Sequence, residues 1–179
     1  MHPHPSQHCS QAGMTLAELV VTLAVAGIIS AIAMPAFGDM LTAARVRTAV
    51  SDLSADLALA RISAISHGRA YVLCPSSDGL QCRRDGRWDA GWIGFHGGGS
   101  PPAAPPSGPG SHRQRRDDGI GIVSGSGRPH VRYLPDGRSA GTNLTIHVCA
   151  GDRVAARVVV NNAGRPRTEW LRTAVACPG

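Results

Sequence analysis

Two arginines near the C-terminal end of the chain are spaced so that they could bind phosphate. Gly164-Arg165-Pro166-Arg167 follows Asn161-Asn162-Ala163, and glycine after asparagines favours a tight turn. If the backbone beyond the turn is extended, Arg165 and Arg167 lie two positions apart and project to the same side. Each guanidinium can donate paired hydrogen bonds to phosphate oxygens, and such contacts bind DNA without reading its sequence. The alternative is an ordinary solvated turn in an arginine-rich chain.

Other residues could add to such a site. Arg113, Arg115 and Arg116 lie at the end of a stretch rich in Gly, Pro and Ser, and Trp170 lies close to Arg167. Loop arginines can reach a phosphate backbone without a preformed groove, and an exposed indole can stack on a base. We treat these four residues as possible additional DNA contacts. The alternative is that they only keep the surface solvated.

The composition indicates a basic protein without catalytic machinery. The chain has 18 basic residues, every one of them Arg, against 12 acidic residues, for a net charge of +6. Such an excess favours polyanionic partners such as nucleic acid or anionic lipid. A GC-rich coding sequence would explain why Arg replaces Lys, but it would not explain the excess over acids. Ser, His and Asp are scattered without a nucleophile elbow or paired carboxylates, so we predict no enzyme and no cofactor.

The N-terminal part contains an apolar segment with one acid inside it. Gly13-Met14-Thr15-Leu16-Ala17-Glu18-Leu19 leads into apolar sequence that continues to Met34. About 20 apolar residues span a bilayer as a helix, so a transmembrane segment is predicted over about residues 16–34. A carboxylate in lipid costs about 2–3 kcal/mol, which makes Glu18 a functional candidate. The alternative is a signal anchor with a stray glutamate.

This junction resembles the class III signal of type IV pilins and type II secretion pseudopilins, which reads Gly, Phe or Met, Thr, Leu, an aliphatic residue, Glu, Leu. The resemblance implies that residues 1–13 are a leader. A prepilin peptidase would cut after Gly13 and methylate the new amine on Met14. In the family, the carboxylate at the position of Glu18 pairs with the terminal amine of a neighbouring subunit. Met14 and Ala17 depart from the commoner Phe and Ile.

The cysteines predict disulfide bonds. Cys9 lies in the leader, and an even set remains on the translocated side: Cys74, Cys82, Cys149 and Cys177. This suggests two disulfides formed in an oxidising periplasm, with three possible pairings. We expect Cys74–Cys82 and Cys149–Cys177, because each closes a local loop around turn-rich sequence. A zinc site is the alternative, but no Cys-x-x-Cys pair is present, so we predict no metal.

The rest of the sequence predicts one long helix followed by short strands. An apolar stripe with helical spacing comprises Val46, Val50, Leu53, Leu57, Ala60 and Ala64. Charged residues off this stripe, including Asp52, Asp56 and Arg61, are expected to be solvated. We expect a helix over residues 14–67 that ends at Gly68, and a β-rich globular domain over residues 68–179. Within that domain, a disordered loop is expected at about residues 97–118 because its composition buries little apolar surface.

A second resemblance covers most of the chain. It rests on Ala60-Arg61-Ile62-Ser63-Ala64-Ile65, His67-Gly68-Arg69, Leu73-Cys74-Pro75-Ser76 and Gly91-Trp92-Ile93-Gly94-Phe95. These segments resemble the minor pilins called FimT and the pseudopilin GspH. The resemblance implies an α+β fold, with a long N-terminal pilin helix packed on a small antiparallel β-sheet or β-sandwich. Members of the FimT family that take up DNA carry a Gly-Arg-x-Arg motif near the C-terminus, which residues 164–167 match.

We therefore expect a minor type IV pilin that binds double-stranded DNA non-specifically for uptake in natural transformation. Its expected partners are double-stranded DNA, other major and minor pilins, the prepilin peptidase and the inner membrane. It would cross the inner membrane once, expose a periplasmic globular domain, and be incorporated into the extracellular pilus. The alternatives are a GspH-like pseudopilin of a type II secretion system and an assembly-priming minor pilin that does not bind DNA.

Overall fold

The computed structural model describes residues 13–97, 111–115, 119–125, 127–141 and 143–178. The expected leader up to residue 12, Arg116 and most of the expected loop lie outside this set. The chain forms two compact units, one up to Leu41 and one from Thr42 onward. The second unit is called the β-rich domain below, and each unit is described by itself.

Helix α1 (Leu16–Ser66) begins in the first unit. Thr15 caps its start, because the Thr15 hydroxyl accepts a hydrogen bond from the Glu18 backbone N–H at 3.3 Å. The first part of the helix is apolar and exposed. By length and composition, this helix can cross a membrane.

The second half of α1 belongs to the β-rich domain and buries the predicted stripe. Leu53, Leu57 and Ala64 are fully buried on this face. The helix ends at Gly68, which adopts a φ of 57°. The Gly68 N–H bonds to the Ile65 carbonyl and the next N–H to the Ala64 carbonyl, both at 3.2 Å. This Schellman arrangement requires a left-handed residue at the position that the sequence predicts.

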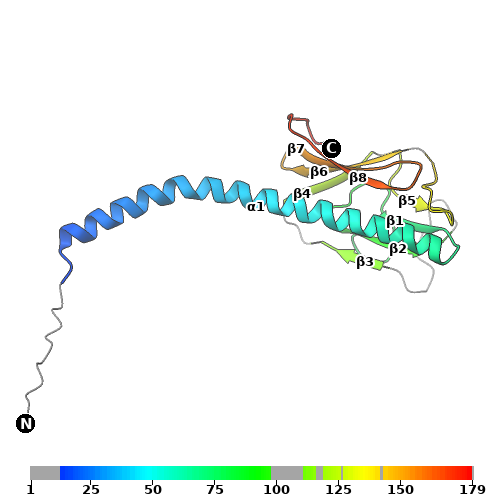
Figure 1. Ribbon diagram of the computed structural model, residues 1–179, viewed down its shortest axis with the longest axis horizontal. Coiled ribbons are helices and arrows are strands. Elements are labelled where there is room, and N and C mark those ends of the chain that lie inside the picture. The colour runs from blue at the N-terminus through cyan, green and yellow to red at the C-terminus, as the bar shows by residue number, and fades with distance from the viewer. Residues whose placement is uncertain (1–12, 98–110, 116–118, 126, 142, 179) are drawn as a thin grey trace, which may run out of the picture. The chain divides into compact units, whose positions relative to one another are not determined.

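Two four-stranded antiparallel sheets complete the domain (Figure 1). The first has the order β3-β2-β1-β5 and comprises β1 (Tyr71–Pro75), β2 (Gly91–His96), β3 (Ser111–Gln114) and β5 (Val131–Tyr133). The second has the order β4-β6-β7-β8 and comprises β4 (Ile120–Ser124), β6 (Leu144–Ala150), β7 (Arg153–Val160) and β8 (Pro166–Trp170). The predicted α+β class, with a long helix and small antiparallel sheets, is confirmed.

A single main core joins the helix to the inner faces of both sheets. Trp88, Trp92 and Tyr133 are the largest side chains that it buries. Strands β1, β4, β5, β6 and β7 contribute alternate residues to this core, since successive side chains of a strand point to opposite faces. On the opposite face of the first sheet, a smaller cluster gathers Val72, Cys74, Ile93 and Phe95.

The expected disorder of residues 97–118 is wrong for Ser111–Gln114, which form β3. This strand pairs with β2 from Gly91↔Gln114 to Gly94↔Ser111. Its Arg113 donates hydrogen bonds to both carboxylate oxygens of Asp56 on α1. Backbone pairing and an ion pair therefore order a segment that has little apolar surface to bury.

The expectation that Asp56 is solvated is also wrong. Its side chain is only 12 % exposed. The Trp92 indole N–H donates to the Asp56 carboxylate at 2.7 Å, and Arg113 approaches it from β3. The burial of this charged carboxylate is compensated because Trp92 and Arg113 both donate hydrogen bonds to it.

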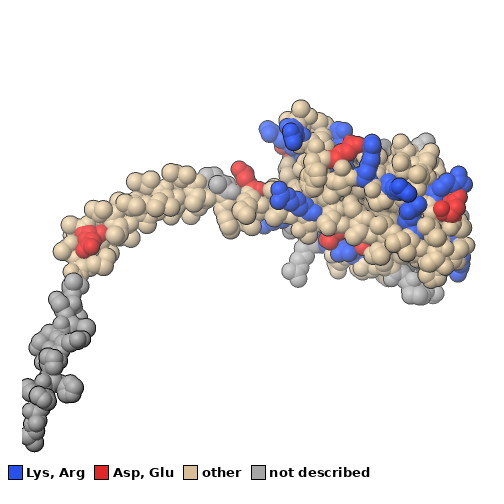
Figure 2. All heavy atoms as spheres, in the orientation of Figure 1, with Lys and Arg blue, Asp and Glu red and all other residues tan. Residues whose placement is uncertain are grey.

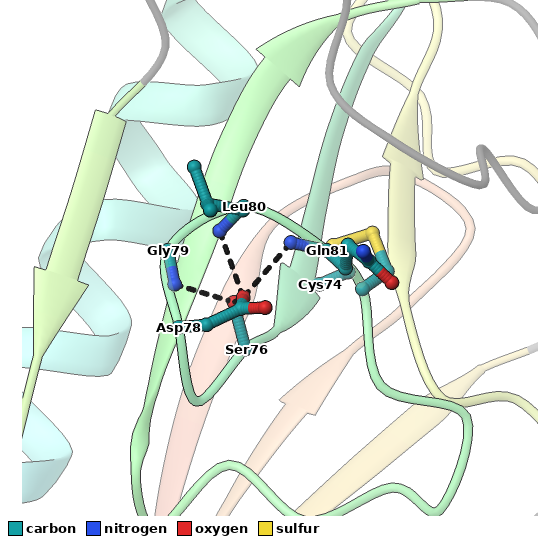
Figure 3. The surroundings of a disulfide bond; sticks show 7 residues. Cys74, Ser76, Asp78, Gly79, Leu80 and Gln81 are labelled. Carbon is teal, nitrogen blue, oxygen red and sulfur yellow. Dashed lines mark hydrogen bonds between the residues drawn. A yellow bond between two sulfur atoms is a disulfide. The ribbon is translucent and has the colours of Figure 1, made fainter.

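Both predicted disulfides, Cys74–Cys82 and Cys149–Cys177, are present. The first closes a loop that is ordered by its own polar groups (Figure 3). The Asp78 carboxylate accepts backbone hydrogen bonds from Leu80 at 2.8 Å and Gln81 at 3.0 Å. These N–H groups hold the pKa of Asp78 below its usual value.

Candidate nucleic-acid interface

The predicted arginine motif lies in the turn that joins β7 to β8. The Gly164 N–H donates to the Asn161 carbonyl at 2.8 Å, and the Arg165 N–H donates to the Asn161 side-chain oxygen at 3.3 Å. Gly164 has a φ of 76° and is buried. A Cβ added at this position would overlap the carbonyl oxygen of Gly137. Glycine is therefore required here both for its backbone conformation and for lack of space.

A second turn and the helix hold this turn in place. Gly137 lies between β5 and β6, and its carbonyl accepts a hydrogen bond from Arg61 Nε on α1 at 2.9 Å. Arg61 is partly buried, so the expectation that it is solvated is wrong. The Arg61 guanidinium thus ties the Gly137 turn, and through it the Gly164 turn, to the helix. The sequence gives no sign of this junction, because Arg61 and Gly137 are 76 positions apart.

The register of β8 decides where its side chains point. Pro166, Thr168 and Trp170 pair with Val160, Val158 and Ala156, which are core residues. Directly paired residues share a face of the sheet, so Arg167 projects from the opposite side, here called the outer face. Arg165 lies in the turn one residue before β8, and it is exposed.

Both arginines are accessible. Arg165 is exposed, and its side chain forms no ion pair within the described ranges of the chain. The Arg167 side chain is 68 % exposed and contacts the Glu169 carboxylate at 2.8 Å. An exposed pair of this kind is worth at most about 1 kcal/mol, so a phosphate can compete for Arg167. Figure 2 shows basic side chains, with acidic ones among them, over the part of the domain that contains β8.

The structure does not bring the additional candidates to this motif. Trp170 is 54 % exposed but lies on the face of β8 opposite Arg167. Arg113 is held by Asp56 on the edge strand of the other sheet. Arg115 lines a pocket of about 330 Å³ together with Arg87 and Asp89. Arg116 lies outside the described residues.

A long, exposed apolar helix followed by this two-sheet domain defines a pilin-type protein. The prokaryotic N-terminal methylation motif matches residues 9–34, which include Gly13, Met14 and Glu18. The profile described as "Type II transport protein GspH" matches residues 49–164, more than half of the chain. The chain therefore belongs to the GspH family and is a minor type IV pilin of the GspH/FimT type.

Known proteins agree with this assignment. A fimbrial protein of Pseudomonas aeruginosa is 43 % identical over 63 residues, which cover 35 % of this chain and 40 % of that protein. The fimbrial protein EcpB of Eikenella corrodens is 33 % identical over 70 residues, covering 39 % and 43 %. The chain thus spans less than half the length of these relatives. A crystal structure of the P. aeruginosa type IV minor pilin FimU is similar in fold, with a TM-score of 0.56 and 21 % identity over 75 % of this chain and 96 % of that one.

Proposed function

We propose that this minor pilin binds double-stranded DNA non-specifically through Arg165 and Arg167, for DNA uptake in natural transformation. The observation that carries the proposal is the built turn at Gly164, which is followed directly by two exposed arginines. The two residues are about 7 Å apart along an extended backbone, so they can contact neighbouring phosphates of one strand. Contacts limited to phosphate suit DNA of arbitrary sequence.

The proposal also includes how the subunit is processed and placed. A prepilin peptidase cuts after Gly13 and methylates Met14, and Glu18 pairs with the terminal amine of a neighbouring pilin. The apolar part of α1 lies in the inner membrane, and the domain reaches the periplasm before incorporation into the pilus. The match to the methylation motif, the apolar helix and the two disulfides support this placement.

The test is DNA binding by the full chain in a neutral detergent. Fluorescence anisotropy with a short random-sequence duplex is measured at low and moderate salt. The variant is Arg165→Ala with Arg167→Ala, and the control is Arg47→Ala with Arg69→Ala, which removes the same charge from two other exposed arginines. Salt-sensitive binding that is lost only in the first variant is expected, because phosphate contacts release counterions. Absence of binding by the folded wild type at low salt would refute the proposal.

A second function is favoured by one observation, the match to the profile named for type II transport. In that case the chain is a pseudopilin of a type II secretion system, and its arginines only keep the surface charged. Deleting the gene would then abolish secretion of exoproteins, while the Arg165 and Arg167 double variant would restore it fully. If the chain is instead an assembly-priming minor pilin, the gene deletion would abolish pilus formation and the same double variant would restore it.

A further inference from the structure

The outer face of the second sheet carries two adjacent nitrogen-rich side chains beyond β8. His147 on β6 and Arg157 on β7 are directly paired in the register. Their neighbours Ile146, Val148 and Val158 face the core, so the side chains of His147 and Arg157 project from the outer face. Directly paired residues have Cβ atoms about 4.5–5.5 Å apart, which brings the imidazole beside the guanidinium.

Both side chains have buried nitrogen atoms without a partner. Nδ1 of His147 and Nε of Arg157 are shielded from solvent, and neither forms a hydrogen bond within the described part of the chain. Most buried polar atoms in proteins are hydrogen-bonded to protein groups or to ordered water, so both side chains have hydrogen-bonding capacity that the described residues leave unused. Glu169 is paired with Arg157 in the register, but its carboxylate is engaged by Arg167 at 2.8 Å.

The surroundings of His147 suit an anion. His147 lines an open cleft of about 400 Å³ together with Arg128, Asn143 and Thr145. The other lining residues are Gly125, Gly127 and Leu144, so none of the described residues that line the cleft is acidic. Burial, and then the charge of Arg157, lowers the pKa of His147, so its imidazole is neutral at neutral pH. A phosphate oxygen there would accept hydrogen bonds from the Arg157 guanidinium and from the N–H of the neutral imidazole.

Arg157 also continues the row begun by the turn. Arg167 is paired with Val159, two positions from Arg157 on the same strand, and all of them belong to the outer face. Adjacent strands are about 4.8 Å apart, so Arg167 on β8, Arg157 on β7 and His147 on β6 lie one strand after another across the sheet. A row of separated cations matches the repeated charges of a nucleic-acid backbone better than a single small anion.

We infer that His147 and Arg157 form a second phosphate-binding site, so that the DNA backbone runs from the Arg165–Arg167 pair across β7 to the cleft beside β6. This inference rests on the proposed DNA-binding function. It assigns DNA contacts to β6 and β7 as well as to the turn before β8.

The salt dependence of DNA binding tests this path, because each phosphate contact contributes about 0.9 to the slope of log K against log salt. In the full chain in detergent, Arg157→Ala is expected to weaken binding about tenfold and to reduce this slope by about 0.9. Arg157→Lys should keep the slope. His147→Ala should weaken binding and leave the slope unchanged, because the imidazole is neutral. The matched control is Arg153→Ala, which removes an exposed arginine from the same strand and should behave like the wild type.

The outcomes separate the two proposals. Arg157→Ala could retain wild-type affinity and slope while the Arg165 and Arg167 double variant loses binding. In that case the inference of a second phosphate-binding site is wrong and the proposed function stands. If the wild type does not bind DNA, both are wrong. Circular dichroism and free-thiol counts check folding. If the alanine variant does not fold, Arg157→Gln replaces it, because glutamine keeps part of the aliphatic stem and a hydrogen-bond donor. This variant must then show the same reduction in the slope of log K against log salt.

Discussion

Replacing Gly164 by alanine should both destabilise the domain and impair the proposed DNA contacts. The left-handed conformation costs an alanine about 1 kcal/mol. The new methyl group must also displace the Gly137 carbonyl, which breaks its hydrogen bond to the charged Arg61 side chain. A hydrogen bond to a charged group contributes about 2 kcal/mol. The expected loss is therefore about 3 kcal/mol, which lowers the Tm of a domain of this size by about 10 °C.

The matched control for this prediction is Gly151→Ala, in the turn between β6 and β7. Gly151 also has a positive φ, of 60°, but a Cβ added there meets nothing within 4 Å. Its replacement should cost only the backbone term of about 1 kcal/mol. Thermal unfolding followed by circular dichroism, with both disulfides intact, measures both losses. If Gly164→Ala destabilises the domain no more than Gly151→Ala, the tight junction with Gly137 and Arg61 does not exist as described.

Three further predictions concern the scaffold. Asp56→Ala should lower the free energy of unfolding by about 2 kcal/mol, since it removes the partner of Arg113 and the acceptor of an indole N–H. It should also speed amide hydrogen exchange in β3, and unchanged exchange there would contradict the anchoring role of Asp56. Burial, and then two flanking arginines, lower the pKa of His130 below 6.5. Because the unfolded imidazole binds a proton that the folded one resists, stability should fall as the pH drops below 6.5, and His130→Gln should flatten this dependence in urea titrations. Removing Cys149–Cys177 with two serines should cost about 1 kcal/mol more than removing Cys74–Cys82, because it frees a longer loop; equal losses would speak against the loop-entropy argument.

Local patterns predicted much of this fold. The helical stripe ending at Gly68 and the pairing of nearby cysteines depend on residues close in sequence, so periodicity and spacing suffice. The order of β3 depends on Asp56, 57 residues before Arg113, and nothing in a Gly- and Pro-rich segment indicates such a partner. The position of Trp170 shows a different limit of reasoning from sequence. It is close to Arg167 in sequence, but a separation of three places two residues on opposite faces of a strand.

The candidate site was predicted only in part. The Gly-Arg-Pro-Arg segment is contiguous, so its turn and the exposure of its arginines follow from local rules. His147 and Arg157 become neighbours only through the register of β6 and β7, which the sequence does not specify. The alternation of Arg157 with apolar residues indicates an outward position, but it does not indicate what lies opposite.

The Cys149–Cys177 bond has a mechanical consequence. It joins two cysteines that are 28 positions apart, and the covalent ring that it closes contains β7, the Gly164 turn and β8. Tension applied through DNA held at Arg165 would enter the chain inside this ring. If β8 peeled away from β7, the ring would limit how far that hairpin could extend, and the strain would pass back to β6 instead of unravelling the C-terminal end. A subunit in which this disulfide is formed should therefore lose the DNA proposed to bind there before it unfolds, whereas a reduced subunit has no such covalent limit.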